Sequence, residues 1–226
     1  MIKTQTHEYL DKAQELAAKV AERVDEIDAE RKISTDLFRD IADAGFFRLL
    51  VPSSLGGVEL PPLVFFEIVR IFAEVDASTA WCINQNNIFA TDAARMPYET
   101  AHKLWDDRYC VVTNGPPLAG SKAVPFEGGY RLSGHWDFSS GSSYSTWLAA
   151  RSSVEGEPGP NRMFLIPKTD ATMLDTWQVN GLRGTASFSF ELDDVFVPQS
   201  YTYSVSYTHL RAHETDSYLV CRLLLE

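Results

Sequence analysis

Apolar residues recur every three or four positions through the first part of the chain, which is the spacing of helices that bury one face. The first such stripe covers residues 10–27, and later stripes contain Phe38, Phe65 and Ile83. We predict five or six helices within residues 1–108. Because the connecting segments are short, these helices should pack as antiparallel neighbours.

Capping and turn residues separate the stripes. Ser34 or Thr35 can cap the second helix, and Pro61 and Pro62 suit the first turn of the third. Asp76 is a suitable cap for the fourth helix, because its carboxylate can accept from the free backbone N–H groups at the start of a helix. The helical prediction therefore rests on caps as well as on periodicity.

The pattern changes at about Tyr109 to short apolar runs separated by glycine, proline and serine. Several short runs at such spacing are typical of an antiparallel barrel or sandwich. Gly128-Gly129 favours a hairpin turn. The runs lie at residues 110–113, 130–138, 147–152, 163–167, 173–179, 188–192 and 195–197. We predict an α+β fold, with a helical domain over residues 1–108 and a β domain over residues 109–204.

Composition limits the function. The 226 residues are 45% hydrophobic, enough for a packed core, and the formal net charge is −11. Such an acidic chain is a poor partner for nucleic acid or for an anionic membrane. Cys82, Cys110 and Cys221 lie far apart and lack metal-ligand spacing, so we expect no metal site, reduced thiols and a cytoplasmic protein.

The segment at residues 134–147 stands out chemically. Trp136 and Phe138 alternate with His135 and Asp137, which predicts a strand with one buried face, and a serine-rich loop follows. An apolar wall beside several short hydroxyls suits a planar heteroaromatic ligand with polar edges. The same residues are also typical of a plain hairpin with a serine-rich turn.

Four motifs of this chain resemble motifs of the acyl-CoA dehydrogenase superfamily and follow one another in the same order. The resemblance covers roughly residues 5 to 203. The motifs are Leu50-Val51-Pro52 with Gly56-Gly57, the segment at residues 134–147, the Gly-Leu-Arg-Gly-Thr run at residues 181–185 and the run at residues 193–198. The resemblance implies a helical domain, a flavin-binding β domain and a C-terminal helical bundle. We expect that bundle, with the catalytic base and the homotetramer interface, to be missing from this chain.

Within these motifs, the residues of the chain are more similar to those of the flavin-dependent two-component monooxygenases than to those of the dehydrogenases. Trp-Asp-Phe-Ser-Ser-Gly at residues 136–141 and Asn-Gly-Pro-Pro after Thr113 depart from the dehydrogenase pattern. The resemblance implies a hydroxylase of an aromatic or heterocyclic small molecule that uses FMN or FAD, reduced by a separate flavin reductase. The alternatives are an acyl-CoA dehydrogenase and a non-catalytic truncated fragment.

The resemblance assigns flavin contacts to the strand and loop of this segment. Ser140 falls opposite the flavin N5, with its neighbour Ser139 as the alternative, and strand alternation predicts that their side chains point opposite ways. Phe138 and Trp136 become walls for the flavin ring, both on one face of the strand. Without a ligand, the serines would be turn residues and the aromatics core residues.

Further candidates lie outside this segment. By resemblance, Thr113 and Asn114 face the pyrimidine edge of the flavin, although a strand-end turn explains them equally well. Arg183 could bind a flavin phosphate or a substrate oxygen, or form an ion pair within the β domain. His135 could be a general base, but its predicted side of the strand favours a surface histidine.

The predicted fourth helix carries four consecutive amides at residues 84–87. By resemblance this helix approaches the substrate, so Trp81, Gln85 and Asn86 are candidates for the substrate pocket. A solvated helix face is the simpler explanation of the amides. No dinucleotide, phosphate-loop, zinc-protease or serine-hydrolase motif occurs in the chain.

The last segment, residues 205–226, does not continue any pattern of the chain. Its reverse translation is similar to a sequencing adapter followed by primer sequence, so we expect it to be an artefact and exclude it from the fold. A natural C-terminal helix is the alternative, since the end of the segment is apolar.

Overall fold

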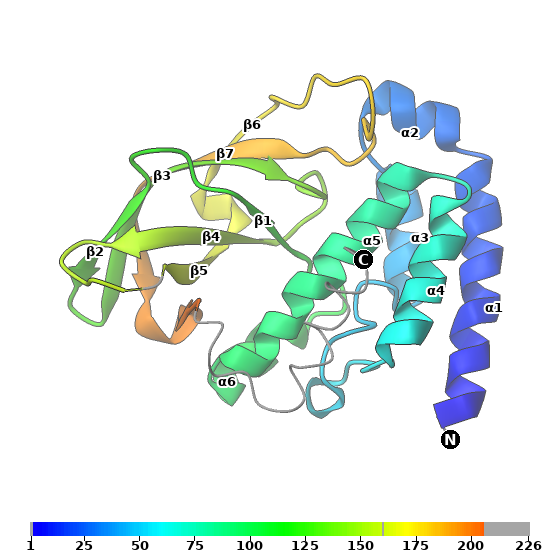
Figure 1. Cartoon of the computed structure of the whole chain (residues 1–226), viewed down its shortest axis with the longest axis horizontal. Helices are drawn as coiled ribbons and strands as arrows, with labels where there is room; N and C mark the ends of the chain where they lie inside the picture. Colours follow the sequence, from blue (N-terminus) through cyan, green and yellow to red (C-terminus); the bar gives the residue numbers. More distant parts are fainter. Residues whose placement is uncertain (1, 160, 206–226) are drawn as a thin grey trace.

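The structure, a computed structural model, describes residues 2–159 and 161–205 of the chain. The predicted tail therefore lies outside the described residues, apart from Val205. Helices occupy one end of the molecule and strands the other (Figure 1). The helices are α1 (Ile2–Ala21), α2 (Val24–Glu30), α3 (Thr35–Asp43), α4 (Pro62–Ala73), α5 (Ala77–Ala90) and α6 (Tyr98–Trp105).

The strands follow the helices in the chain and form one sheet. They are β1 (Val112–Gly115), β2 (Lys122–Phe126), β3 (Gly129–Ser139), β4 (Trp147–Val154), β5 (Arg162–Pro167), β6 (Thr172–Leu174), β7 (Phe188–Pro198) and β8 (Thr202–Ser204). Their order is β6-β7-β3-β2-β4-β5-β8, with β1 paired to β4. The predicted α+β fold is confirmed. The pairs β1–β4 and β2–β4 are parallel, so the sheet is not wholly antiparallel.

Several element boundaries differ from the prediction. The first apolar stripe is split between α1 and α2, because Arg23 leaves the helical conformation and its guanidinium pairs with Glu26 and Asp36. The stripe could not show this break, since residues are buried on both sides of it. The two predicted runs at residues 188–197 form one strand, β7, in which Asp194 has a positive φ of 52°.

The predicted domain boundary at residues 108 and 109 falls between α6 and β1, and a shared core crosses it. Trp105 of α6 and Ala90 of α5 belong to the same buried cluster as Ala149 of β4 and Leu165 of β5. Separate cores lie within the helices and within the sheet. The helical and β parts are therefore joined by buried apolar contacts rather than by a linker.

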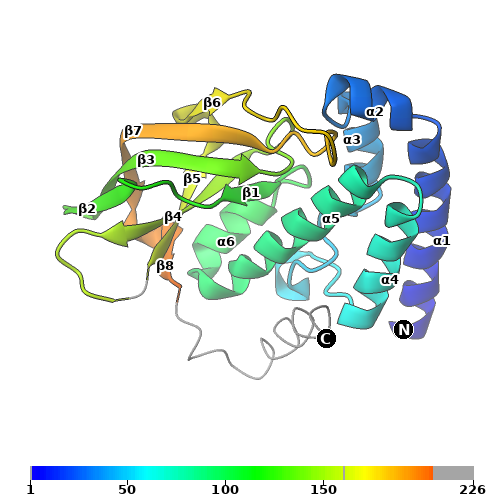
Figure 2. The ribbon, with the colours of Figure 1, turned by 45° about the horizontal axis from the view of Figure 1, so that its top comes forward.

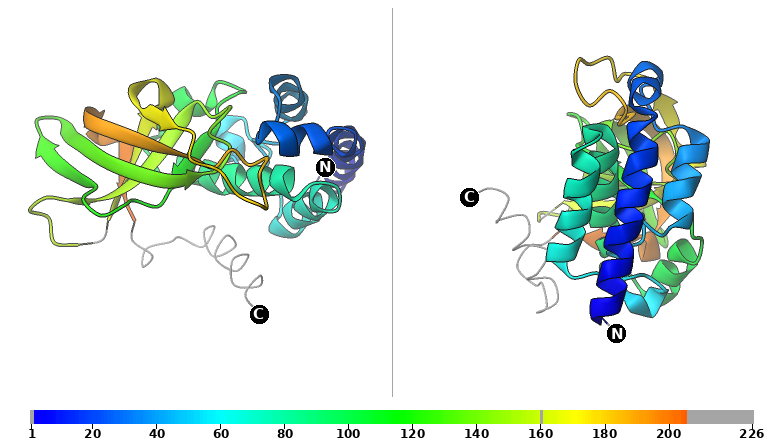
Figure 3. Two further views of the ribbon diagram at one scale, coloured as in Figure 1. Left: turned by 90° about the horizontal axis from the view of Figure 1, so that it is seen from above. Right: turned by 90° about the vertical axis from the view of Figure 1, so that its right-hand side faces the viewer.

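Helix α5 is the element that connects the two parts. It lies between α4 and β1 and has buried residues on several sides, both apolar and polar, as expected for a helix with neighbours all round (Figure 2). Its start follows the prediction, because the Asp76 carboxylate accepts from the Thr79 backbone N–H at 2.7 Å. At the outer end of the molecule, α1 packs on α4 and α3 (Figure 3).

The described cysteines are buried and free. Burial raises the pKa of the Cys82 and Cys110 thiols to about 12, which keeps them protonated and unreactive. Within residues 2–159 and 161–205, no cluster of His, Cys, Asp and Glu side chains could hold a metal ion. In the same part of the chain, no helix has the length and apolarity to cross a membrane.

The contact of the loop after β6 with the helices generates a stability prediction. A Cβ added to Gly184 would lie 2.1 Å from Ile27 Cγ2 and 3.0 Å from Ser78 Cβ. We expect Gly184→Ala to lower the free energy of unfolding by about 1–3 kcal/mol, the usual cost of overpacking. Urea denaturation measures it.

Gly181→Ala is the matched control, because a Cβ at that position meets nothing within 4 Å. Equal denaturation midpoints for the two variants would contradict the close packing of Gly184 between α2 and α5.

Candidate functional site

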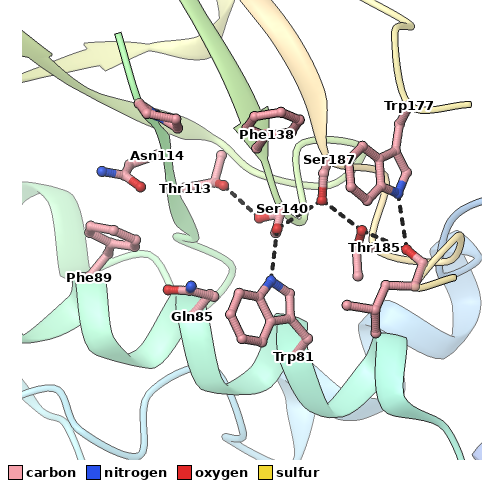
Figure 4. A pocket seen from close by; sticks show the side chains of 12 residues that line it. Trp81, Gln85, Phe89, Thr113, Asn114, Phe138, Ser140, Trp177, Thr185 and Ser187 are labelled. Carbon is pink, nitrogen blue, oxygen red and sulfur yellow. Dashed lines mark hydrogen bonds between the residues drawn. The ribbon is translucent and has the colours of Figure 1, made fainter. Parts of the chain in front are cut away.

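A pocket with a cavity of about 270 Å³ opens where α5 meets the sheet (Figure 4). Its walls come from α5, β1, the end of β3 with the loop that follows it, and the segment between β6 and β7. The lining residues are Trp81, Gln85, Phe89, Thr113, Asn114, Pro116, Phe138, Ser140, Trp177, Leu182, Thr185 and Ser187. The pocket thus collects residues that are more than one hundred positions apart in the chain.

Aromatic rings form the apolar part of the wall. The Phe138 side chain is 58% exposed and the Trp81 side chain 40% exposed, both large values for aromatic residues. Phe138 packs edge-to-face against Trp177, with ring centroids 5.9 Å apart. Exposed aromatic rings gathered around one cavity are typical of a ligand site.

The end of β3 departs from strand alternation, which corrects one prediction. Trp136 does not share a face with Phe138: its ring is fully buried, stacks on Phe190 at 5.2 Å and donates from Nε1 to the Arg151 carbonyl at 3.0 Å. The pairing of β3 with β7 shifts between Trp136 and Ser139, and Phe138 has a positive φ of 59°. This bulge turns Phe138 to the pocket and leaves Trp136 in the core.

A row of hydroxyl groups forms the polar part of the wall. Trp81 Nε1 donates to Ser140 Oγ at 2.9 Å, and Ser140 Oγ lies 2.8 Å from Ser187 Oγ. Ser187 Oγ lies 2.6 Å from Thr185 Oγ1, which donates to the Leu182 carbonyl at 2.9 Å. Figure 4 shows this row along one side of the cavity.

The backbone of Ser140 is fixed from two other elements. Its carbonyl accepts from Thr113 Oγ1 at 2.5 Å and from Asn86 Nδ2 at 3.3 Å. Asn86 Nδ2 also lies 3.3 Å from the Val112 carbonyl, and Asn86 Oδ1 accepts from the Tyr144 hydroxyl at 3.0 Å. Asn86 therefore joins α5 to β1 and to the loop after β3.

The amides of α5 are divided between pocket and scaffold. Gln85 lines the pocket, as the sequence suggested. Asn86 and Asn87 are buried instead. Asn86 does not line the pocket, and Asn87 donates to the Phe46 and Ile83 carbonyls. A solvated amide face is therefore the wrong explanation. Buried amides are retained here because they satisfy backbone carbonyls that water cannot reach.

Two other candidates lie outside the pocket. Ser139 is buried, and no described atom forms a hydrogen bond with its hydroxyl, while the neighbouring Ser140 reaches the cavity. Arg183 donates to the Asp28 and Val179 carbonyls and pairs with the Asp28 carboxylate at 3.3 Å. Of its two proposed roles, the structure shows an ion pair, although with α2 rather than within the β domain.

Six pocket residues were missed as candidates: Phe89, Pro116, Trp177, Leu182, Thr185 and Ser187. Phe89 is on α5, and Trp177, Thr185 and Ser187 come from the segment between β6 and β7. The motif at residues 181–185 was the only signal in this segment, and nothing in it indicated which side chains enter the pocket. Thr113 and Asn114, which were predicted, do line it.

His135 lies outside the pocket lining, between two carboxylates. Its Nδ1 is 3.0 Å from Glu191 Oε1 and its Nε2 is 2.8 Å from Asp137 Oδ1, which also accepts from Ser189 Oγ. Since a carboxylate only accepts, bonding to both requires a doubly protonated ring. The bond to Glu191, helped by Asp137, raises the pKa of His135 above 6.5.

The comparisons with known proteins agree with the fold and the pocket. A helical part, a following sheet and a pocket at their junction are the arrangement implied by the motifs, and residues 4–103 match the family model of the acyl-CoA dehydrogenase N-terminal domain. The resemblance to the acyl-CoA dehydrogenase superfamily, and within it to flavin-dependent monooxygenases, is confirmed.

Individual relatives point to the monooxygenase branch. HsaA of Rhodococcus jostii (strain RHA1), the oxygenase subunit of a flavin-dependent monooxygenase, is 33% identical over 181 residues, or 78% of this chain and 47% of that protein. The oxygenase component of the FADH(2)-dependent resorcinol hydroxylase of Rhizobium sp. (strain MTP-10005) is 31% identical over 176 residues, 75% and 42% of the two chains.

A solved structure extends the likeness over nearly the whole chain. XiaF from Streptomyces sp., in complex with FADH2 and glycerol, has a TM-score of 0.84 at 26% identity and covers 97% of this chain and 60% of its own. The chain spans about half the length of the curated relatives it matches.

The two neighbouring amides of α5 allow a paired test of the site. We expect Asn86→Leu to lower the free energy of unfolding by about 1–3 kcal/mol, since it removes the buried donor to the Val112 and Ser140 carbonyls and the acceptor of the half-buried Tyr144 hydroxyl. Gln85→Leu should leave stability within about 0.5 kcal/mol and change ligand binding instead. Urea denaturation measures both, and the reverse order of stabilities would contradict this division.

The carboxylate pair around His135 generates a pH prediction. A histidine whose pKa is raised on folding stabilises the folded state. For His135 this stabilisation is full below the unfolded pKa of 6.5, and it is lost as the pH rises through the folded pKa. We expect the stability difference between the native chain and His135→Gln to shrink as the pH rises above 6.5 and through the folded pKa of His135. Denaturation midpoints across that range measure it.

His102→Gln is the control for that series, because His102 is exposed on α6. A stability difference for His135→Gln that grows with pH would contradict the predicted role of the pair.

Proposed function

We propose that this chain is part of a reduced-flavin monooxygenase that hydroxylates an aromatic or heterocyclic small molecule, with FMN or FAD reduced by a separate flavin reductase. The pocket carries the proposal, because it combines exposed aromatic rings with a row of hydroxyls at the helix–sheet junction. The names of the relatives, flavin-dependent oxygenase subunits and hydroxylases, support it.

The residues of the pocket fit a flavin ring. A planar ring with polar edges needs an apolar wall and a few placed hydrogen-bonding groups. Trp81 and Phe138 provide the wall, and Thr113, Asn114 and Ser140 provide the groups. The volume of about 270 Å³ lies just below the usual range for small-molecule pockets, so it suits the ring better than a whole dinucleotide.

When bound, the reduced flavin would supply the activation of O₂ and the transfer of one oxygen atom. The residues of the pocket hold and orient the ring and exclude water from it. A hydrogen bond to Ser140 contributes only about 0.5–1.5 kcal/mol, so it orients the ring more than it anchors it.

The pocket has no acid–base group among the described residues. Its lining contains no Asp, Glu, His, Lys, Arg, Cys or Tyr side chain. We therefore infer that the catalytic base belongs to a part of the parent protein outside this chain, as in a C-terminal helical bundle. The proposed parent is a cytoplasmic homotetramer, and the 226-residue chain alone should bind flavin weakly and turn over little or not at all.

Flavin binding by the chain as it stands tests the proposal. We expect quenching of flavin fluorescence to show weak binding of FMN or FAD, and Phe138→Ala to weaken it about tenfold through loss of the aromatic wall. Phe196→Ala is the control, because Phe196 is also exposed but lies outside the pocket lining. Absence of any flavin binding would leave the chain a non-catalytic fragment.

The dehydrogenase alternative has a separate readout. Bleaching of the flavin absorbance by an acyl-CoA, without a reductase, would indicate an acyl-CoA dehydrogenase and contradict the proposal. No response to acyl-CoA, together with hydroxylation of a phenol or indole by the longer parent protein and reduced flavin, is the result we expect.

A further inference from the structure

A second pocket, with a cavity of about 520 Å³, opens between the loop that joins α2 to α3 and the β part of the molecule. It shares no lining residue with the first pocket, and its volume lies within the usual range for small-molecule sites. The lining residues are Glu30, Arg31, Lys32, Ile33, Thr35, Ser142, Ser143, Tyr144, Lys168, Met173, Asp175 and Phe188.

The charged side chains of this second pocket are unevenly paired. Three of them are cationic and two are carboxylates. Arg31 holds Asp175 with two hydrogen bonds of 2.7 and 2.6 Å, and Lys32 Nζ lies 3.9 Å from the Glu30 carboxylate. Lys168 has no carboxylate partner among residues 2–159 and 161–205. A chain with a formal net charge of −11 therefore keeps one unneutralised cation in this pocket.

The Lys168 ammonium is held in a defined place. It donates to the Ser142 carbonyl and, at 3.3 Å, to the Ser143 carbonyl. Burial lowers its pKa from the ordinary value of 10.5, because removal from water disfavours the charged form. An ammonium group has three N–H donors, so one of them is left for a ligand. An anion beside it would offset the cost of burying this charge.

Apolar side chains form another part of the wall. Ile33, Met173 and Phe188 line the pocket, and Met173 and Phe188 are only partly buried. The Tyr144 ring is fixed by stacking on Phe38, with centroids 4.5 Å apart. An inorganic anion would leave these apolar side chains facing water. A ligand with an apolar body beside its anionic group therefore fits the pocket better.

Ser143 provides a hydroxyl that is not committed to the fold. Its Oγ is buried, and none of the described residues forms a hydrogen bond with it. Rotation about the Cα–Cβ bond can therefore turn this hydroxyl toward a ligand without breaking a hydrogen bond. Because Lys168 contacts the carbonyl of the same residue, an anion bound to Lys168 lies close to this donor.

We propose that the second pocket is a separate small-molecule site that binds an organic anion with an apolar body, such as an aromatic carboxylate, through Lys168. Arg31 is occupied by Asp175 and fixes the wall on the helical side, so Lys168 is the cation that remains to bind the anionic group. Ser143 adds a hydrogen bond to the same group. The inference goes beyond the proposed function and does not depend on flavin binding.

The experiment is a titration of the 226-residue chain with three probes at constant ionic strength, followed by the amide chemical shifts in NMR spectra. Benzoate has the ring and the charge, benzyl alcohol has the ring alone, and inorganic phosphate has charge alone. We expect benzoate to shift the amide signals of Ser143, Lys168 and Phe188. It should bind at least about tenfold more tightly than benzyl alcohol, the range of one charge-assisted hydrogen bond, and more tightly than phosphate.

Variants of Lys168 test the role of its charge. Lys168→Met keeps the length of the side chain and should weaken benzoate binding at least about tenfold while leaving benzyl alcohol unaffected. Lys168→Arg keeps the charge and should preserve the preference for benzoate. Lys103→Met is the matched control, because Lys103 is exposed on α6 and lies outside the pocket lining, and it should change neither constant.

Ser143→Ala separates binding from stability. It should weaken benzoate binding about two- to tenfold, the range of one net hydrogen bond. It should not lower the urea denaturation midpoint, because the hydroxyl has no partner to lose. This variant and Lys168→Arg keep the test decisive if circular dichroism shows that Lys168→Met has lost its fold.

Several outcomes would overturn the inference. Equal affinities for benzoate and benzyl alcohol would show that the charge is not recognised, and tighter binding of phosphate would show an inorganic anion site. Shifts confined to Trp81 and Phe138 would place benzoate in the first pocket instead. Flavin titration of the same sample reports separately on the proposed function: failure to bind FMN would leave the second site standing, and absence of benzoate shifts would overturn only the second site.

Discussion

The pocket depends on the way in which the Ser140 carbonyl is held. Two groups from different elements, Thr113 Oγ1 of β1 and Asn86 Nδ2 of α5, donate to this one carbonyl. A buried carbonyl without partners would be costly, so its bonds draw the helix, the first strand and the loop after β3 together. Because the carbonyl is fixed, the Ser140 hydroxyl has a defined position beside Trp81.

A second constraint lies two residues before Ser140, at Phe138. Phe138 adopts a left-handed conformation at the bulge of β3, which is unfavourable for a non-glycine residue and is found preferentially at functional sites. The bulge allows one strand to serve two purposes, with Trp136 in the core and Phe138 at the cavity. The resulting wall is apolar or neutral throughout, so its chemistry is binding, orientation and exclusion of water rather than proton transfer.

Local physics was enough to predict much of the fold from the sequence. Helix periodicity and capping residues, such as Asp76, identify the helices, because these signals depend on neighbours three or four positions away. The change to short alternating runs marks the start of the sheet. Phe138, Ser140, Thr113 and Asn114 could be proposed as pocket residues because they lie within or beside recognisable motifs.

Only the tertiary structure decided the rest. Alternation predicts that Trp136 and Phe138 share a face, but the pairing of β3 with β7 creates a bulge between them, and such pairing is not written in either strand alone. Asn86 was assigned to the pocket, yet the carbonyls it serves lie 26 and 54 positions away. Ser187 likewise reaches Ser140 across 47 positions, so the row of hydroxyls in the pocket exists only in the folded molecule.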